Sequence, residues 1–288
     1  MKARQAQVMA AVEAQFARTF GAFGATPVVQ GMRYATDGGK RIRAMLAMEG
    51  ASLHEIPDAQ SVWSGCAIEA LHAYSLVHDD LPCMDDDDLR RGQPTVHIKW
   101  DEATAVLVGD ALQSLAFELV SSPEVSDVPA VRAELALTLA RASGGQGMVL
   151  GQALDIAAES ADDPLTLEEI TALQAGKTGA LIKWAALVGP RMAQADTSAL
   201  TTYAEALGLA FQIQDDVIDV TGDAAAAGKA VGKDEAAGKA TFVSLMGLAE
   251  AKRRAETLVE NACDALSVYG DKADTLQQLA RFVISRQT

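Results

Sequence analysis

The chain has 288 residues, of which 49% are hydrophobic and 22% charged, a composition typical of globular proteins and not of disordered ones. Its formal net charge of −15 makes nucleic acid a poor partner, because an acidic surface repels the phosphate backbone. The three cysteines are widely spaced and form neither a disulfide framework nor a metal-binding pattern, which favours a reducing compartment.

The first twenty residues contain polar side chains throughout and lack the apolar core of a signal peptide. No stretch approaches the roughly 18–20 apolar residues of a membrane-spanning helix. We therefore expect a soluble, cytoplasmic protein that does not insert stably into a membrane.

Five segments, taken in chain order, have the character of helices, because they are rich in Ala and Leu and contain few helix breakers. The third begins at Thr166, where Glu169 completes a capping box. No segment shows the sustained alternation of a half-buried strand, and no Pro-, Gly- or Ser-rich linker divides the chain. We therefore expect one all-α domain over residues 1–288. The predicted helices are residues 61–81, 104–120, 166–190, 198–220 and 240–266.

The first acidic cluster has the sequence DDLPCMDDDD, at residues 79–88, and follows the first predicted helix. His72, Ser75 and Asp79 share one face of that helix because of their spacing. Pro82 removes a backbone donor and should break or kink the helix. A separation of six residues does not place Asp79 and Asp85 on one face of a regular helix, so the kink is needed to bring them together.

The second acidic cluster is DDVID at residues 215–219. Gln212, Asp215, Asp216 and Asp219 occupy positions i, i+3, i+4 and i+7, so they line one stripe of a helix. Neighbouring carboxylates repel one another unless a cation lies among them. Hard oxygen ligands in small number suit magnesium, which completes its shell with water and phosphate oxygens. The alternative is that each cluster is a solvated acidic turn. The presence of two such clusters, each ending an apolar helix, makes this alternative weaker than it would be for a single cluster.

Basic groups accompany both clusters, as phosphate chemistry requires. GGKRIR at residues 38–43 combines a flexible turn with three charges, which suits close approach of the backbone to an anion. Arg90 and Arg91 follow the first cluster directly, and the alternative is that they only neutralise its aspartates. The second cluster is followed by Lys229, Lys233 and Lys239.

Two further candidates lie within predicted helices. Lys177 stands between Gly176 and Gly179, which invite a local distortion of the helix, although it could be an ordinary surface lysine. His72 on a mostly apolar helix would usually be a core histidine, and its position on the same face as Asp79 is what makes it a candidate.

In chain order these motifs resemble those of the trans-isoprenyl diphosphate synthases, most closely the bacterial group that forms farnesyl diphosphate. The matching segments cover most of the chain from about residue 30 to 250 and are jointly specific. The resemblance implies a single polyprenyl synthetase domain, an all-α bundle of the isoprenoid synthase type around a deep central cavity, and usually a homodimer. The segments are GGKRIR (38–43), HAYSLVHDDLPCMDDDDLRRGQPTVH (72–97), GQALDI (151–156), GKTGALI (176–182), FQIQDDVIDVTGD (211–223) and GKDEAAGKATF (232–242).

The resemblance also implies that the two acidic clusters bind three magnesium ions, two at the first cluster and one at the second. These ions would hold the diphosphate of the allylic substrate and neutralise it as it leaves. The implied ligands are Asp79 and Asp85, with Asp80 and Asp86 nearby, and Asp215, with Asp216 and Asp219 in support.

The basic and polar candidates receive roles in the same way. The isopentenyl double bond would attack the allylic cation, and a proton would then be lost to the released diphosphate. The implied contacts are Arg90, Lys177, Lys229 and Lys239 to the allylic diphosphate, Lys40, Arg43, His72 and Arg91 to isopentenyl diphosphate, and Thr178 and Gln212 near the carbocation.

Product length should depend on Tyr74 and Ser75, which the resemblance places at the floor of the tunnel for the growing chain. An aromatic residue five positions before Asp79 favours the fifteen-carbon farnesyl product. The insertion in DDLPCMD fits the bacterial short-chain subgroup, yet geranylgeranyl diphosphate synthases share it. A geranylgeranyl or geranyl diphosphate synthase, or a non-catalytic synthase subunit, therefore stays open. Ala44 and Phe242 depart from the usual proline and tyrosine, and neither change removes a charged ligand.

Overall fold

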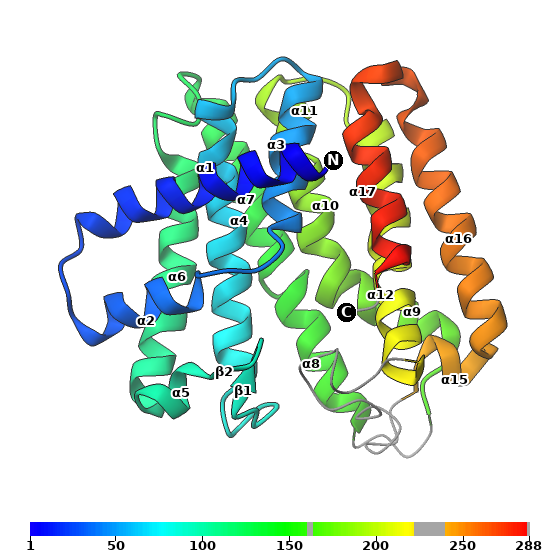
Figure 1. Cartoon of the computed structure of the whole chain (residues 1–288), viewed down its shortest axis with the longest axis horizontal. Helices are drawn as coiled ribbons and strands as arrows, with labels where there is room; N and C mark the ends of the chain where they lie inside the picture. Colours follow the sequence, from blue (N-terminus) through cyan, green and yellow to red (C-terminus); the bar gives the residue numbers. More distant parts are fainter. Residues whose placement is uncertain (160–163, 222–239, 287–288) are drawn as a thin grey trace. The chain divides into compact units, whose positions relative to one another are not determined.

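The computed structural model describes residues 1–159, 164–221 and 240–286 (Figure 1). These residues are helical almost throughout, and their strands are confined to one antiparallel pair, β1 (Leu89–Arg90) and β2 (Gln93–Pro94). The predicted all-α class is confirmed. Contacts within the chain divide it into two compact units, Met1–Leu137 with Val188–Ala195 and Thr138–Leu187 with Asp196–Thr288, and each is described by itself. The single-domain organisation and the central cavity therefore stay predictions.

In the first unit, α4 forms the centre, and it packs along α6 and against α3. It is buried almost all round between Ser61 and Ala73. Its small residues allow this close packing: a Cβ built on Gly65 would already touch Ala44 and Met48 of α3, at 3.5 and 3.6 Å. The helices of the unit are α1 (Lys2–Gly21), α2 (Pro27–Ala35), α3 (Ile42–Leu53), α4 (Asp58–Asp79), α5 (Val96–Lys99), α6 (Glu102–Ser121), most of α7 (Pro129–Ser143) and α11 (Val188–Met192).

Helix α6 has the length and the mean hydropathy, 1.4 over 18 residues, that a membrane span would have, and among the described helices it alone does. The prediction that no segment has this character is therefore wrong for α6. Core helices of soluble proteins pass the same test, and α6 buries one face, including Val108, Leu112 and Leu119, against the rest of the unit.

In the second unit, α12 is the longest helix, and it packs along α16. Its buried face includes Ile213 and Val217, which form a hydrophobic cluster with Ile170, Phe242 and Ala251. The elements of the unit are α8 (Met148–Glu159), α9 (Leu167–Gln174), the π-helical segment η1 (Ala175–Gly179), α10 (Ala180–Ala186), α12 (Ser198–Thr221), α15 (Phe242–Met246), α16 (Leu248–Ala265), the 3-10 segment η2 (Leu266–Ala273) and α17 (Asp274–Ser285).

Local sequence signals determine where two of the predicted helices begin or break. The capping box is confirmed, because the Thr166 amide donates to Glu169 Oε2 at 2.8 Å and the Glu169 amide donates to Thr166 Oγ1 at 3.3 Å. The helix predicted for 240–266 is divided at Gly247, whose φ of 81° only glycine adopts readily, so that α15 and α16 are separate. No helix is predicted from the sequence at α1 to α3, α5, α7, α8 or α17.

Candidate active site

The first acidic cluster begins where α4 ends, at Asp79. Beyond Pro82 the chain turns back, so that the Asp85 amide donates to the Asp79 carbonyl at 2.8 Å, and the Asp86 amide donates to the Leu81 carbonyl at 3.2 Å. The predicted kink is thus confirmed for the backbone, and it brings Asp85 back to the end of α4. The side chains of Asp85 and Asp86 are exposed.

Asp80, the next residue, is buried and bound to Arg90 of β1. Arg90 Nε lies 2.8 and 3.0 Å from the two carboxylate oxygens, and Nη2 lies 2.6 Å from Oδ1. Burial raises the pKa of the Asp80 carboxyl, while the hydrogen bonds from Arg90 oppose that shift. Arg90 thus neutralises Asp80, while its predicted contact to a diphosphate stays a prediction.

His72 on α4 lies within reach of the charges of several arginines. Burial holds the pKa of His72 well below its usual value, and the charges of Arg43, Arg91, Arg90 and Arg41 lower it further. The imidazole is therefore neutral near pH 7, and its surroundings are positively charged. Several guanidinium groups gathered around a neutral donor are suited to binding an anion such as diphosphate.

The turn at Gly38 and Gly39 lies against this region. A Cβ built on Gly39 would fall 2.8 Å from Arg91 Nη1, so the absence of a side chain lets the guanidinium approach the backbone. Gly39 has a φ of 84°, a second reason why glycine is needed there. The turn, Arg90 and Arg91 line a pocket of about 550 Å³ in the first unit.

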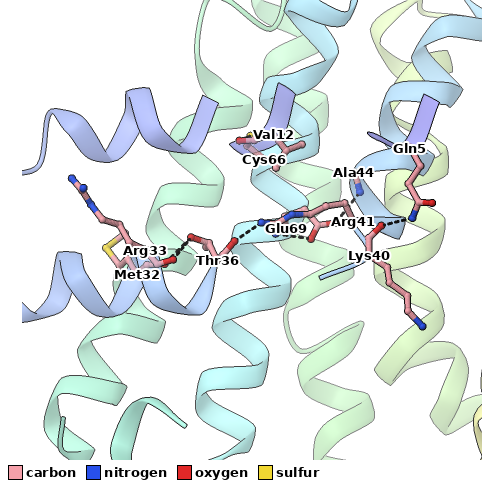
Figure 2. A network of polar contacts seen from close by, with 10 residues as sticks. All are labelled: Gln5, Val12, Met32, Arg33, Thr36, Lys40, Arg41, Ala44, Cys66 and Glu69. Atoms are coloured by element: carbon pink, nitrogen blue, oxygen red, sulfur yellow. Dashed lines mark hydrogen bonds and ion pairs between the residues drawn. The ribbon is translucent and has the colours of Figure 1, made fainter. Parts of the chain in front are cut away.

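A buried ion pair holds the GGKRIR segment in place (Figure 2). Arg41 Nη1 lies 3.3 Å from Glu69 Oε2, and Glu69 Oε1 accepts a 3.0 Å bond from the Ala44 amide at the start of α3. Arg41 also donates to the Thr36 carbonyl, and the Lys40 carbonyl accepts from Gln5 at 3.0 Å. In Figure 2 the Lys40 ammonium points away from this network.

Sequence reasoning assigned no role to Arg41 or Glu69. A signal for Glu69 existed, because it is a charged residue within a long apolar helix, where an unpaired carboxylate would be costly. The structure shows that Arg41 is the positioning group of the segment, whereas Lys40 and Arg43 stay the predicted substrate contacts.

In the second unit, Lys177 and Thr178 lie in the π-helical segment η1. The distortion predicted from Gly176 and Gly179 is confirmed, and such segments are frequent at functional sites. Lys177 Nζ lies 2.7 Å from Asp155 Oδ2 on α8, so Asp155 is a partner that sequence reasoning missed. Its presence in the matched GQALDI segment was the available signal.

Glycines allow α8 and η1 to lie in backbone contact. A Cβ on Gly151 would fall 2.1 Å from the Lys177 amide nitrogen. We therefore expect Gly151→Ala to lower the free energy of unfolding by about 1–3 kcal/mol, because the two backbones must separate. It should also lower kcat, since a displacement of about 1 Å in a substrate-positioning group can cost about 10²-fold.

Gly145→Ala is the matched control, because a Cβ there has nothing within 4 Å. Chemical denaturation and steady-state kinetics of the two variants check the prediction. Equal free energies of unfolding and equal kcat values for the two variants would show that the contact between α8 and η1 does not position Lys177.

A chain of polar contacts connects η1 with the second acidic cluster. Thr178 Oγ1 donates to Gln212 Oε1 at 3.2 Å, and Gln212 Nε2 donates to Asp216 Oδ1 at 3.3 Å. Asp216 is buried, and its Oδ2 accepts from the Phe242 amide at 2.7 Å. Thr178 and Gln212, both expected near the carbocation, thus lie side by side, and Asp216 is held from within the protein.

Asp215, on the same stripe, has a different environment. Its Oδ1 lies 2.7 Å from Arg286 Nη2, and 40% of its side chain is exposed against 9% for Arg286. Sequence reasoning missed Arg286, which lies outside every motif. Asp219 is partly buried on the last turn of α12. The stripe predicted for the second cluster therefore contains carboxylates with distinct partners.

Magnesium fits these carboxylates as an ion that shares its coordination with a substrate. Among the described residues, no three His, Cys, Asp or Glu side chains converge as a metal site made by protein alone. Magnesium commonly binds through one or two carboxylates and substrate phosphates, so this donor set suits it. Lys229, Lys233 and Lys239 lie outside the described residues.

Tyr74, the predicted floor residue, lies on the face of α4 that packs against α6. Its ring contacts His78 edge to face, with centroids 5.1 Å apart and an interplanar angle of 81°. His78 Nε2 lies 3.1 Å from the Val106 carbonyl of α6. Burial raises the pKa of Tyr74, so its phenol stays neutral. Ser75 donates to the His72 carbonyl at 2.9 Å.

The whole chain is similar to known prenyl synthases. The farnesyl diphosphate synthase of Escherichia coli is 44% identical over 272 residues, which cover 91% of this chain and 90% of that protein. An apo FPP/GFPP synthase structure from Zymomonas mobilis matches with a TM-score of 0.90 and 44% identity, covering 98% of each chain. A Helicobacter pylori geranyltransferase complexed with magnesium and isoprenyl diphosphate matches with a TM-score of 0.78 and 33% identity, covering 95% of each chain. The polyprenyl synthetase family model matches residues 27–279, and the chain belongs to the polyprenyl synthetase family.

Proposed function

We propose that this protein is a farnesyl diphosphate synthase, which condenses isopentenyl diphosphate with dimethylallyl or geranyl diphosphate and releases diphosphate. The observation that carries the proposal is the junction of an acidic and a basic cluster in the first unit. Arg90 binds Asp80 beside the Asp79–Asp85 turn, and Arg90 also contributes to the positive region around His72. Carboxylates for a divalent ion and guanidinium groups for a diphosphate thus adjoin each other.

Magnesium, when bound, would supply the positive charge that stabilises the departing diphosphate. We assign Asp79, Asp85 and Asp86 of the first cluster and Asp215 and Asp219 of the second as its direct ligands. Asp80 and Asp216 take supporting roles, because both are buried and both of their carboxylate oxygens are bound within the protein, those of Asp80 by Arg90 and those of Asp216 by Gln212 and the Phe242 amide. The use of three ions is part of this proposal.

The cations then divide between the two substrates. Lys40, Arg43, His72 and Arg91 hold the diphosphate of isopentenyl diphosphate, and the neutral His72 does so as a hydrogen-bond donor. Lys177, placed by η1 and by Asp155, binds the allylic diphosphate together with Arg90, Lys229 and Lys239. Thr178 and Gln212 direct oxygen dipoles toward the developing carbocation, where such fixed dipoles stabilise positive charge without reorganisation.

The protein forms a homodimer in the cytoplasm, without stable insertion into a membrane. Residues 1–288 act as one catalytic domain, which the match of one family model to residues 27–279 supports. The apolar face of α6 contributes to the protein core, in keeping with its buried Val108, Leu112 and Leu119.

A direct assay tests the activity. Purified protein is incubated with magnesium, isopentenyl diphosphate and either dimethylallyl or geranyl diphosphate, with an EDTA-treated sample as the control. Mass spectrometry should detect farnesyl diphosphate, and only when magnesium is present. Absence of diphosphate release with both allylic substrates would reject the enzyme and favour the non-catalytic subunit. A twenty-carbon main product would identify a geranylgeranyl diphosphate synthase instead.

Tyr74→Ala should shift the product from fifteen carbons to twenty or more. The reason is that removal of the ring opens space beside His78, into which the growing chain can extend. Tyr269→Ala, the same exchange in η2, is the matched control and should leave the product unchanged. Product analysis by mass spectrometry decides, and an unchanged length for Tyr74→Ala would show that the tunnel floor lies elsewhere.

A further inference from the structure

Arg286, just after α17, is held against the C-terminal half of α12. Its guanidinium stacks over the Phe211 ring at 3.8 Å from the centroid, and Nη2 donates to the Phe211 carbonyl at 2.9 Å. Its own carbonyl accepts from Gln214 Nε2 at 3.2 Å. Arg286 therefore reaches Asp215 as an ordered group, and not as a mobile surface side chain.

The ion pair of Arg286 with Asp215 differs from that of Arg90 with Asp80. Arg90 makes three bonds to the Asp80 carboxylate, whose side chain is only 4% exposed, so this carboxylate is enclosed. Arg286 reaches only Oδ1 of Asp215, and the nitrogen that does so, Nη2, also donates to the Phe211 carbonyl. In addition, 40% of the Asp215 side chain is exposed to solvent. The Asp215 carboxylate is therefore more open to a cation from solvent than the Asp80 carboxylate is.

We infer that Arg286 is a positioning residue. In the substrate-free protein its guanidinium occupies the side of the Asp215 carboxylate where a divalent ion would bind, and it competes with that ion for the carboxylate. This inference rests on the proposed function, in which Asp215 is a metal ligand. The positive guanidinium holds the carboxylate in place between turnovers and stabilises it against its neighbours Asp216 and Asp219. Binding of a divalent ion weakens this pair, so the C-terminal end of α17 is coupled to the occupancy of the second acidic cluster.

Metal titration of the substrate-free protein tests this competition. Mn²⁺ is the probe, because electron paramagnetic resonance measures its free concentration directly. Arg286→Gln should bind Mn²⁺ about fivefold more tightly, since it removes one positive charge a few ångströms from the ion. Arg286→Lys keeps the charge and should stay within about twofold of the wild type. An Arg286→Gln affinity that is unchanged or weaker would overturn the inference.

Arg253→Gln is the matched control for a general loss of charge, because Arg253 pairs with Glu250 on the exposed surface of α16 in the same unit. Its Mn²⁺ affinity should stay within about twofold of the wild type. A gain equal to that of Arg286→Gln would show a nonspecific charge effect and overturn the inference.

A second measurement uses the wild type alone, so it holds even if Arg286→Gln folds poorly. Hydrogen exchange of the peptide covering residues 280–286 should rise when Mg²⁺ is added, because the pair with Asp215 is weakened. Unchanged exchange would overturn the inference. Neither measurement uses a prenyl substrate, so a failure of the synthase assay would count against the proposed function, and a failure here would count against the role of Arg286.

Discussion

Asp79→Asn should lower kcat by about 10²–10³-fold, the range found when one stabilising group for developing charge is removed. Asparagine keeps the size of the side chain but removes the negative charge, so a divalent ion loses a strong ligand. The fold should be retained, because Asp79 is the last residue of α4 and its backbone carbonyl, which accepts from the Asp85 amide, is unchanged by the substitution. Steady-state kinetics with saturating magnesium check the prediction.

Asp58→Asn is the matched control for this variant, since Asp58 lies at the opposite end of the same helix. Asp58 pairs with Arg4 at 2.6 Å and belongs to neither acidic cluster. The kcat of Asp58→Asn should therefore stay near that of the wild type. A kcat for Asp79→Asn within about twofold of the wild type would remove Asp79 from the proposed metal ligands.

Glu69→Gln should lower the free energy of unfolding by about 3–5 kcal/mol, the cost of removing one partner from a buried ion pair. The side chains of Arg41 and Glu69 are 4% and 7% exposed, so the remaining guanidinium would keep an uncompensated charge away from water. Glutamine still provides an oxygen for the Ala44 amide, which isolates the effect of the charge. Urea denaturation measures the change.

The same variant should also weaken the binding of isopentenyl diphosphate, because Arg41 positions the segment that carries Lys40 and Arg43. Glu205→Gln is the matched control, since its pair with Lys183 is exposed and such pairs contribute about 0–1 kcal/mol. Equal losses of stability in the two variants would show that the Arg41–Glu69 pair does not hold the segment.

Both expected effects depend on how a charged side chain is enclosed. Asp79 lies at a helix end beside exposed carboxylates, so its loss should affect ligand binding more than folding. Glu69 lies in the middle of a buried helix, so its loss should affect folding first. The difference comes from burial, because a charge costs most where water cannot reach it and its partner is missing.

Several features of the protein followed from the sequence alone, because local chemistry sets them. High helix propensity and the absence of alternating strands indicated the all-α class. The capping box of Thr166 and Glu169, the break at Pro82 and the distortion between Gly176 and Gly179 each involve residues close together in the chain. The order of the motifs along the chain indicated the polyprenyl synthetase family, which the family match confirms.

Tertiary structure decided which charged groups are paired and which stay open to a ligand. Asp80 and Asp216 resemble their neighbours in the sequence, yet Arg90 and the Phe242 amide bind them inside the protein. Arg286 reaches Asp215 from 71 residues away, a partner that no spacing along one helix predicts. Helical periodicity determines the face of a side chain, but burial and pairing depend on segments that are distant in the chain. The sequence therefore predicted the aspartate clusters, but not which of their carboxylates are bound within the protein and which stay open to a ligand.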